Sequence, residues 1–157
     1  MIIRNAKVSD AQQIHAIISD FAGLDRMLFR SMANIYENLQ TFIVAESGGR
    51  IVGCVALAVM WADLAEVKSL AVSRDMGGKG IGRMLVNKAV ENAKSLGVSK
   101  VFALTLEPVF FEKVGFQRVD RKTLPMKVWS DCANCPKQDH CDEIAFMIDC
   151  GKTNDQS

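Results

Sequence analysis

The amino-acid sequence predicts an α/β (α+β) protein with a central sheet of six to seven strands flanked by about four helices. Three observations predict this class. Segments with alternating apolar residues and segments with helical spacing follow one another along the chain. The turn at 47–50, Ser-Gly-Gly-Arg, joins two strand-like segments as a hairpin. Between residues 66 and 96, a strand, a glycine-rich loop and an amphipathic helix come in succession.

Length and composition place the chain among folded proteins of one-domain size. It has 157 residues, of which 49% are hydrophobic and 24% charged, and its net charge is +1. These values exclude a general electrostatic attraction to nucleic acid or membranes. The apolar run 51–62 is too short to cross a bilayer, and the N-terminus lacks the pattern of a signal peptide. We therefore expect a cytoplasmic protein with a single domain over residues 1–150 and a flexible tail over 151–157.

The elements of the first half follow from spacing and turn residues. A first strand ends near Ala6, and the capping-box residues Ser9 and Gln12 open a helix that ends at Gly23. His15 lies off the apolar stripe of this helix and is expected to be a solvated surface histidine. The other expected elements are a helix over 27–40 and strands over 42–46, 51–61 and 64–72.

The second half continues with alternating helices and strands. A helix is expected from Ile81, because apolar residues recur there at helical spacing, and Gly97 ends it. Pro108 suits the first turn of a short helix that closes at Gly115. The remaining expected strands cover 101–105, 116–119 and 143–148.

The loop before the long helix has the features of an anion site. Four glycines lie within six residues, namely Gly77, Gly78, Gly80 and Gly82. They leave a backbone that can adopt positive φ and let a ligand touch its amides. Because the first amides of a helix lack internal partners and the helix dipole is positive there, the loop is suited to bind a pyrophosphate. Lys79 and Arg83 would add formal charge.

Two familiar phosphate loops do not fit this sequence. The Walker loop needs Gly-Lys-Ser/Thr, but Ile81 follows Gly80. The dinucleotide loop needs Gly-x-Gly-x-x-Gly, whereas Gly78, Gly80 and Gly82 are evenly spaced. A plain flexible turn is the other interpretation, but it does not require so many glycines directly before an amphipathic helix.

The segment 70–83 resembles the acetyl-CoA-binding motif of the GNAT superfamily of N-acetyltransferases, usually written Gln/Arg-x-x-Gly-x-Gly/Ala. The matching parts are Leu70-Ala-Val72 and Gly78-Lys-Gly80-Ile-Gly82-Arg83. The resemblance implies a GNAT-type mixed sheet and acetyl-CoA as co-substrate. It also implies that the central strand splays from its neighbour and offers backbone groups of Leu70 and Val72 to the pantetheine arm. Gly77 departs from the motif, because it stands where Gln or Arg is usual. The residues implied to bind acetyl-CoA are Leu70, Ala71, Val72, Gly77, Gly78, Lys79, Gly80, Ile81, Gly82 and Arg83.

Acetyl transfer from a thioester to an amine requires a neutral amine, a polarised carbonyl and a thiolate that can leave. Glu66, at the start of the central strand, is the candidate base, since many GNAT enzymes carry a glutamate there. The alternative is that Glu66 is only an ion-pair partner of Lys68. A backbone amide near Leu70 would polarise the carbonyl.

The proton donor to the thiolate is left open by the sequence. Phe111-x-x-x-Gly-Phe116 resembles the GNAT pattern Tyr-x-x-x-Gly-Phe, with Phe111 in place of the tyrosine often offered as general acid. Phenylalanine cannot donate a proton. Ser69, Thr105 and water remain as candidates.

A second resemblance covers most of the chain and concerns the substrate. The short, stand-alone form of N-acetylglutamate synthase is similar in four segments, namely Arg30-Ser31, 65–72, 110–116 and 124–129. This similarity implies transfer to the α-amine of an amino acid, with glutamate as acceptor for arginine biosynthesis, by direct attack in a ternary complex. It implies that Arg30, Lys68 and Lys127 hold the carboxylates of the acceptor.

Other functions stay open at this point. The same co-substrate could serve another small amine or a protein N-terminus. A CoA-binding regulatory module without catalysis would suit the changes at Gly77 and Phe111. The expected partner is a small-molecule amino acid, with no nucleic acid and no membrane, and a homodimer stays open.

The loop 130–142 carries three cysteines, Cys132, Cys135 and Cys141. They could hold zinc as a structural clip, because thiolate sites use a close Cys-x-x-Cys pair with more distant ligands. His140 beside Cys141 is an awkward further ligand, since adjacent residues rarely ligate one metal. The alternative, a reduced loop with packed or exposed thiols, is preferred, so no metal is expected.

Overall fold

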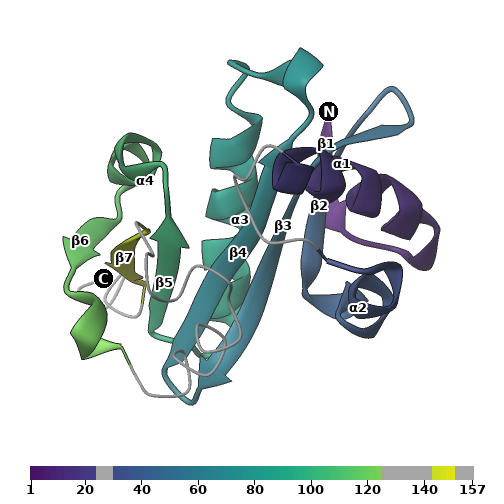
Figure 1. Ribbon diagram of the computed structural model, residues 1–157. Helices are drawn as coiled ribbons and strands as arrows, with labels where there is room; N and C mark the ends of the chain where they lie inside the picture. The colour runs from purple at the N-terminus through teal and green to yellow at the C-terminus, as the bar shows by residue number, and fades with distance from the viewer. Residues whose placement is uncertain (24–29, 125–142, 151–157) are drawn as a thin grey trace.

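The computed structural model describes residues 1–23, 30–124 and 143–150, and within them the strands and helices follow the predicted order (Figure 1). The strands are β1 (Ile2–Asn5), β2 (Phe42–Ser47), β3 (Arg50–Trp61), β4 (Leu64–Val72), β5 (Lys100–Thr105), β6 (Gln117–Val119) and β7 (Ile144–Asp149). The helices are α1 (Ala11–Gly23), α2 (Met32–Glu37), α3 (Ile81–Ser95) and α4 (Pro108–Val114).

The seven strands form one mixed sheet in the order β1-β2-β3-β4-β5-β7-β6. Neighbouring strands are antiparallel except β4 and β5, which are parallel and are joined through α3. This confirms the predicted class of a mixed sheet with four helices. The one parallel pair lies at the centre of the sheet, directly beside the glycine loop.

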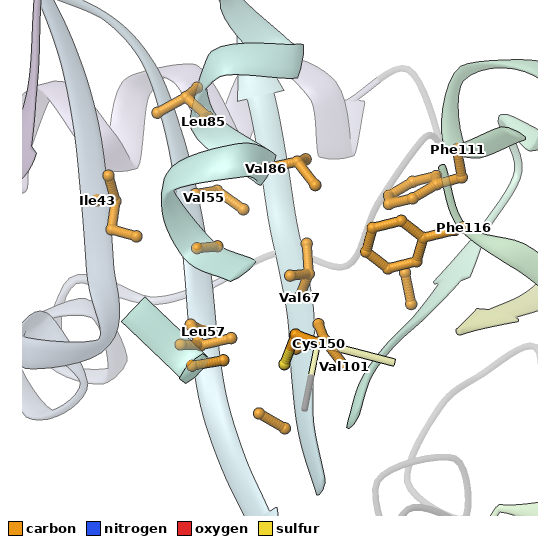
Figure 2. Close-up of a cluster of buried hydrophobic side chains, with 14 of the residues drawn as sticks. Ile43, Val55, Leu57, Val67, Leu85, Val86, Val101, Phe111, Phe116 and Cys150 are labelled. Carbon is orange, nitrogen blue, oxygen red and sulfur yellow. The ribbon is translucent and has the colours of Figure 1, made fainter. Parts of the chain in front are cut away.

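One face of the sheet is covered by α3 and α4. Leu85 and Val86 of α3 pack against Val55 and Val67 of the central strands, and Phe111 of α4 extends the same cluster (Figure 2). Burial of these side chains removes apolar surface from water, which stabilises the fold by about 25 cal/mol per Å² of surface buried. The long helix is therefore fixed against the strands that flank the loop.

The opposite face is covered by α1 and α2. Ile14 and Ile18 of α1 and Ile35 of α2 are buried against Val44 and Ala56. In Figure 1 these two helices lie together at one side of the picture, and α4 lies at the other end beside β6. None of the helices in the described ranges is long and apolar enough to cross a membrane.

The start of α1 differs from the sequence prediction. Ser9 lies inside a short 3₁₀ turn, Val8–Asp10, and α1 begins at Ala11. Asp10, not Ser9, accepts the capping hydrogen bond, from the backbone N–H of Lys7 at 2.8 Å. The predicted capping box was wrong because Ser9 lies inside the 3₁₀ turn, whose N-cap is Lys7, and Asp10 at the third position closes that turn and also binds Arg4.

The second helix is shorter than the predicted range 27–40. It covers Met32–Glu37, and a 3₁₀ turn, Leu39–Thr41, follows it. Ser31 is the N-cap, with an extended backbone and an Oγ that accepts from the N–H of Asn34 at 3.1 Å. The helix begins after this serine because the serine hydroxyl satisfies an amide that has no helical partner.

The glycines predicted to end helices are confirmed. Gly97 and Gly115 follow α3 and α4 with φ of +87° and +103°. This left-handed conformation is open to glycine at little cost, so both helices stop where the chain must turn back to the sheet.

Candidate active site

The glycine loop forms a cradle of backbone amides at the N-terminus of α3. Gly78 and Gly80 have φ of +77° and +78°, and Gly80 is the N-cap of α3. The first amides of a helix have no acceptor within it, and the helix dipole makes this end positive. The cradle is therefore suited to the oxygens of a diphosphate.

Close packing fixes the cradle against its neighbours. A Cβ added to Gly82 would lie 3.3 Å from Cε1 of Phe110. On β3, a Cβ added to Gly53 would lie 3.0 Å from Cδ1 of Leu85 and 3.2 Å from Cγ2 of Ile81. Glycine at these positions lets α3 approach both α4 and the sheet more closely than a larger residue would allow.

Ion pairs anchor the turn Arg74–Met76 that leads into the cradle. Arg74 donates to both carboxylate oxygens of Asp20 in α1, at 2.9 and 2.6 Å, and this bond lowers the pKa of Asp20. Asp75 accepts from the hydroxyl of Ser73 and, at 2.8 Å, from Arg50, and both bonds lower its pKa. These exposed contacts contribute little energy each, but together they tie the turn to α1 and β3.

A cleft opens where β4 and β5 separate. Their ladder comprises three pairs, from Leu64–Lys100 to Glu66–Phe102, and the rest of β4 continues beyond it. The cleft has a volume of about 1280 Å³ and is lined by β4, the glycine loop, the end of β5 and α4. The splayed strand that the GNAT resemblance implies is therefore present.

Most residues expected to bind acetyl-CoA line this cleft. The lining includes the nine residues Leu70, Ala71, Val72, Gly77, Gly78, Gly80, Ile81, Gly82 and Arg83. Lys79 is not among them, and its Nζ lies 3.8 Å from the sulfur of Met76. Gly77 has an ordinary φ of −66°, unlike Gly78 and Gly80.

Two charged side chains of β4 meet in the cleft. Glu66 is buried, with 8% of its surface exposed, and its Oε1 lies 4.0 Å from Nζ of Lys68. Residues two apart in a strand point to the same face, which explains the pairing. Both side chains line the cleft, so the geometry suits Glu66 as a base and as an ion-pair partner of Lys68.

Arg30 reaches the same cleft from the segment before α2. Its Nε donates to Oγ of Ser69 at 2.8 Å, and its Nη1 donates to Oδ1 of Asn34 at 3.0 Å. Its guanidinium lies over the ring of Phe42, 5.1 Å from the centroid. Arg30, Lys68 and Glu66 thus come from distant parts of the chain to one site.

The family follows from comparison of the whole sequence with known proteins. The family model described as acetyltransferase (GNAT) family matches residues 11–116. The chain belongs to this family. The matched range includes the glycine loop, the splayed strand and the segment that ends at Phe116.

Relatives refine the position of this GNAT acetyltransferase. An uncharacterized N-acetyltransferase of Chlorobaculum tepidum is 44% identical over 145 residues, which are 92% of this chain and 94% of that protein. An amino-acid acetyltransferase of Mycobacterium tuberculosis is 35% identical over 133 residues, which are 83% of this chain and 76% of that protein. The chain therefore resembles a short amino-acid acetyltransferase over most of its length.

Solved structures show the same GNAT fold with ligands. A Mycobacterium tuberculosis protein in complex with CoA and a further ligand has a TM-score of 0.83 and 28% identity, covering 95% of this chain and 99% of that one. N-acetylglutamate synthase of Neisseria gonorrhoeae, complexed with coenzyme A and N-acetyl-glutamate, has a TM-score of 0.86 and 26% identity. The match covers 95% of this chain and 35% of the synthase.

Phe111 of this GNAT domain lies in an aromatic cluster. Its ring packs edge-on against Phe110 at 5.1 Å and against Phe116 at 5.2 Å, and it stacks on Phe146 at 6.2 Å between centroids. Figure 2 shows Phe111 and Phe116 beside each other. The residue that replaces the usual GNAT tyrosine therefore serves the core, although it also lines the cleft.

Several sequence predictions lie outside the described residues. These are Lys127, Cys132, Cys135 and Cys141. Across the part of the chain that the structure does describe, no group of three or more potential metal ligands occurs. Cys54 is buried there, which raises the pKa of its thiol to about 12, and its Sγ donates to the carbonyl of Ser69 at 3.6 Å.

The contacts that hold Arg30 were not predicted from the sequence. Asn34 was not singled out, and Ser69 was considered only as a proton donor. The predicted helix over 27–40 would have placed Arg30 and Asn34 on one helical face, but in the structure Arg30 precedes the N-cap Ser31 and reaches Asn34 from outside the helix. Ser69 carried no signal in the sequence, because its contact depends on a break in the regular pairing of β4.

Proposed function

We propose that the chain is an amino-acid N-acetyltransferase that transfers acetyl from acetyl-CoA to the α-amine of glutamate. One observation carries this proposal: a single cleft joins the amide cradle to a cluster of Arg30, Lys68 and Glu66. The cradle suits a diphosphate, two cations suit the carboxylates of an acidic amino acid, and the carboxylate suits its amine. The named amino-acid acetyltransferases among its relatives support the same substrate class.

The residues of the chain divide the work of binding. Acetyl-CoA, the co-substrate, supplies the acetyl thioester. The glycine loop holds the diphosphate through main-chain N–H groups, and Arg83 adds positive charge at the rim of the cradle. Beyond Glu66 the backbone of β4 runs past the end of the β5 ladder, so the amides near Leu70 can bind the pantetheine arm and polarise the thioester carbonyl.

The acceptor is bound and deprotonated on the other side of the cleft. Arg30, Lys68 and Lys127 are proposed to hold its carboxylates. Glu66 accepts a proton from the ammonium, directly or through water, and the neutral nitrogen then bonds to the acetyl carbon as the C–S bond breaks. The thiolate takes up a proton from Thr105 or from water, since the hydroxyl of Thr105 lies in the cleft, whereas the hydroxyl of Ser69 is held by Arg30.

Thiol release from acetyl-CoA across a panel of amino acids tests the proposal. We expect turnover with glutamate, weaker turnover with glutamine, which lacks the second carboxylate, and none with amines that lack both carboxylates. Turnover with a peptide N-terminus but not with glutamate would transfer the activity to another acceptor. Binding of acetyl-CoA without turnover would favour the alternative of a non-catalytic CoA-binding module, which the departures from the GNAT motif at Gly77 and Phe111 suit.

A further inference from the structure

Ser69 is the extra residue of a β-bulge at the centre of the cleft. On either side of the bulge, Lys68 pairs with Ala56 of β3 and Ala71 pairs with Cys54 of β3. One residue separates the partners on β3, but two separate those on β4, which defines a bulge in β4. Ser69 has a φ of +56° and is the one non-glycine residue with positive φ in the described chain. Such a conformation is strained for a residue that carries a Cβ, and it persists only where surrounding contacts hold it.

The bulge changes which side chains face the acceptor. Before it, Val67 packs in the cluster beneath α3, and after it Leu70 does so, a spacing of three residues in place of two. Lys68 and Ser69 are therefore consecutive residues that both avoid the α3 face. Ser69 instead meets Arg30, on the side of the sheet that α1 and α2 cover.

The contacts of Ser69 hold it from two directions. Its carbonyl accepts from the thiol of Cys54, and its hydroxyl accepts from Nε of Arg30. Among the described residues, Ser69, Asn34 and the ring of Phe42 each contact the guanidinium of Arg30. A planar guanidinium binds a carboxylate through two parallel N–H groups, so its orientation decides which carboxylate it accepts.

We propose that Ser69 is a positioning residue that sets acceptor specificity by holding the guanidinium of Arg30 toward the acceptor carboxylate. This inference rests on the proposed function, because it assumes that Arg30 binds the acceptor. It gives the bulge a role other than proton donation. Its strained backbone places one hydroxyl where a regular strand would turn the side chain toward α3.

Two substitutions separate the hydroxyl from the backbone conformation. Glycine and asparagine both tolerate positive φ, but only asparagine carries a side-chain oxygen that can accept a hydrogen bond. We expect Ser69→Gly to raise the KM for glutamate about tenfold, as for the loss of a hydrogen bond to a charged group. Its kcat and its KM for acetyl-CoA should stay within about twofold, and the preference for glutamate over glutamine should fall. Ser69→Asn should restore most of the preference.

The control is Ser99→Ala, which removes a hydroxyl that donates to the carbonyl of Asp63 at 3.4 Å, away from the cleft. It should leave both KM values unchanged, and thermal denaturation should show that all variants are folded. If Ser69→Gly does not fold, Ser69→Ala takes its place. A parent that acetylates no amino acid overturns the proposed function and this inference together. The inference alone is overturned if the parent prefers glutamate over glutamine and Ser69→Gly keeps the same preference. It is also overturned if Ser69→Gly and Ser69→Asn lose this preference to the same extent.

Discussion

At the scale of single residues, Gly77 is the glycine of the cradle that its backbone does not require. Its φ is −66°, and an added Cβ would meet only the carbonyl oxygen of Arg74, at 3.6 Å. We therefore expect Gly77→Arg to be accommodated and to restore the side-chain contact to the diphosphate that the GNAT motif usually provides. The KM for acetyl-CoA should fall about fivefold, measured by steady-state thiol release.

The adjacent glycine supplies the matched comparison. Gly78 has a φ of +77°, so Gly78→Arg adds the same charge at a position where a side chain is strained by about 1–2 kcal/mol. It should not lower the KM. If both variants bind acetyl-CoA alike, net charge and not a specific contact governs binding.

Glu66 can be tested by removing its charge without changing its shape. Glu66→Gln should lower kcat about 100-fold near pH 7, where an acceptor ammonium still needs a base. As pH rises toward the pKa of the acceptor amine, the nitrogen loses its proton without help, so the deficit should shrink. A pH profile of kcat for both proteins measures this. Glu91→Gln, which removes an exposed partner of Lys88 on α3, is the matched control. A deficit that is equal at every pH would show that Glu66 is not the base.

At the scale of elements, the sequence predicted the strands and most helices because their signals are local. Pro108 opens α4 and Gly97 follows α3, as turn chemistry predicts. The bulge at Ser69 was not predictable, because it depends on how β4 pairs with β3, and the sequence 64–72 reads as a regular strand. The cradle was predicted from its glycines, but Arg30 and Lys68 across the cleft were assigned to acceptor binding only through resemblance.

The distance between α3 and the sheet depends on Gly53. A methyl group there would lie 3.0 Å from Leu85 and 3.3 Å from the carbonyl oxygen of Ala71, tighter than most Cβ contacts, so these neighbours would have to shift. We expect Gly53→Ala to lower the free energy of unfolding by about 2 kcal/mol through overpacking. It should also raise the KM for acetyl-CoA, because α3 carries the cradle. Urea denaturation and thiol release measure the two effects.

A second Gly-to-Ala change, in the loop before α3, controls for the loss of glycine. Gly77→Ala adds a methyl group at an ordinary contact distance, so unfolding should change little. If Gly53→Ala is as stable as the parent, the packing of α3 must tolerate the shift, and the helix does not depend on this close approach.

At the scale of the whole molecule, the two faces of the sheet have different tasks. The α3 face carries the cradle, and the α1–α2 face carries the segment with Arg30. The two meet where β4 separates from β5, so the cleft passes from one face to the other. The site therefore depends on how firmly α1 and its neighbours are attached to the sheet.

That attachment includes a partly buried ion network at the edge of the sheet. Arg4 of β1 donates to both oxygens of Asp10, at 2.8 and 3.1 Å, and to Glu46 of β2 at 2.9 Å. Asp10 is 4% exposed and also accepts from the N–H of Lys7 at 2.8 Å. The hydrogen bonds from Arg4 are the main reason that the pKa of Asp10 is lowered.

This network should make stability depend on pH in the acid range. Because the pKa of Asp10 is lower in the folded state than its unfolded value of about 3.9, the unfolded chain binds more protons between these two values. Stability from Asp10 is thus fully present above about pH 4 and is lost as pH falls through the folded pKa. Asp10→Asn should lower the free energy of unfolding at neutral pH by about 2 kcal/mol, as for the loss of hydrogen bonds to a charged group, since Arg4 keeps its pair with Glu46.

The difference in the free energy of unfolding between the parent and Asp10→Asn should therefore narrow as pH falls below 4. Urea denaturation between pH 2.5 and 7 would measure it. Asp20→Asn is the control, because it removes the carboxylate of an exposed pair with Arg74 and should change stability little at any pH. The partly buried Arg4 joins β1, β2 and the turn before α1. Removing the Asp10 carboxylate should therefore also weaken the attachment of α1 to the sheet, on the face that holds Arg30. Parallel pH curves for the parent and Asp10→Asn would mean that other carboxylates govern the acid limit of the fold.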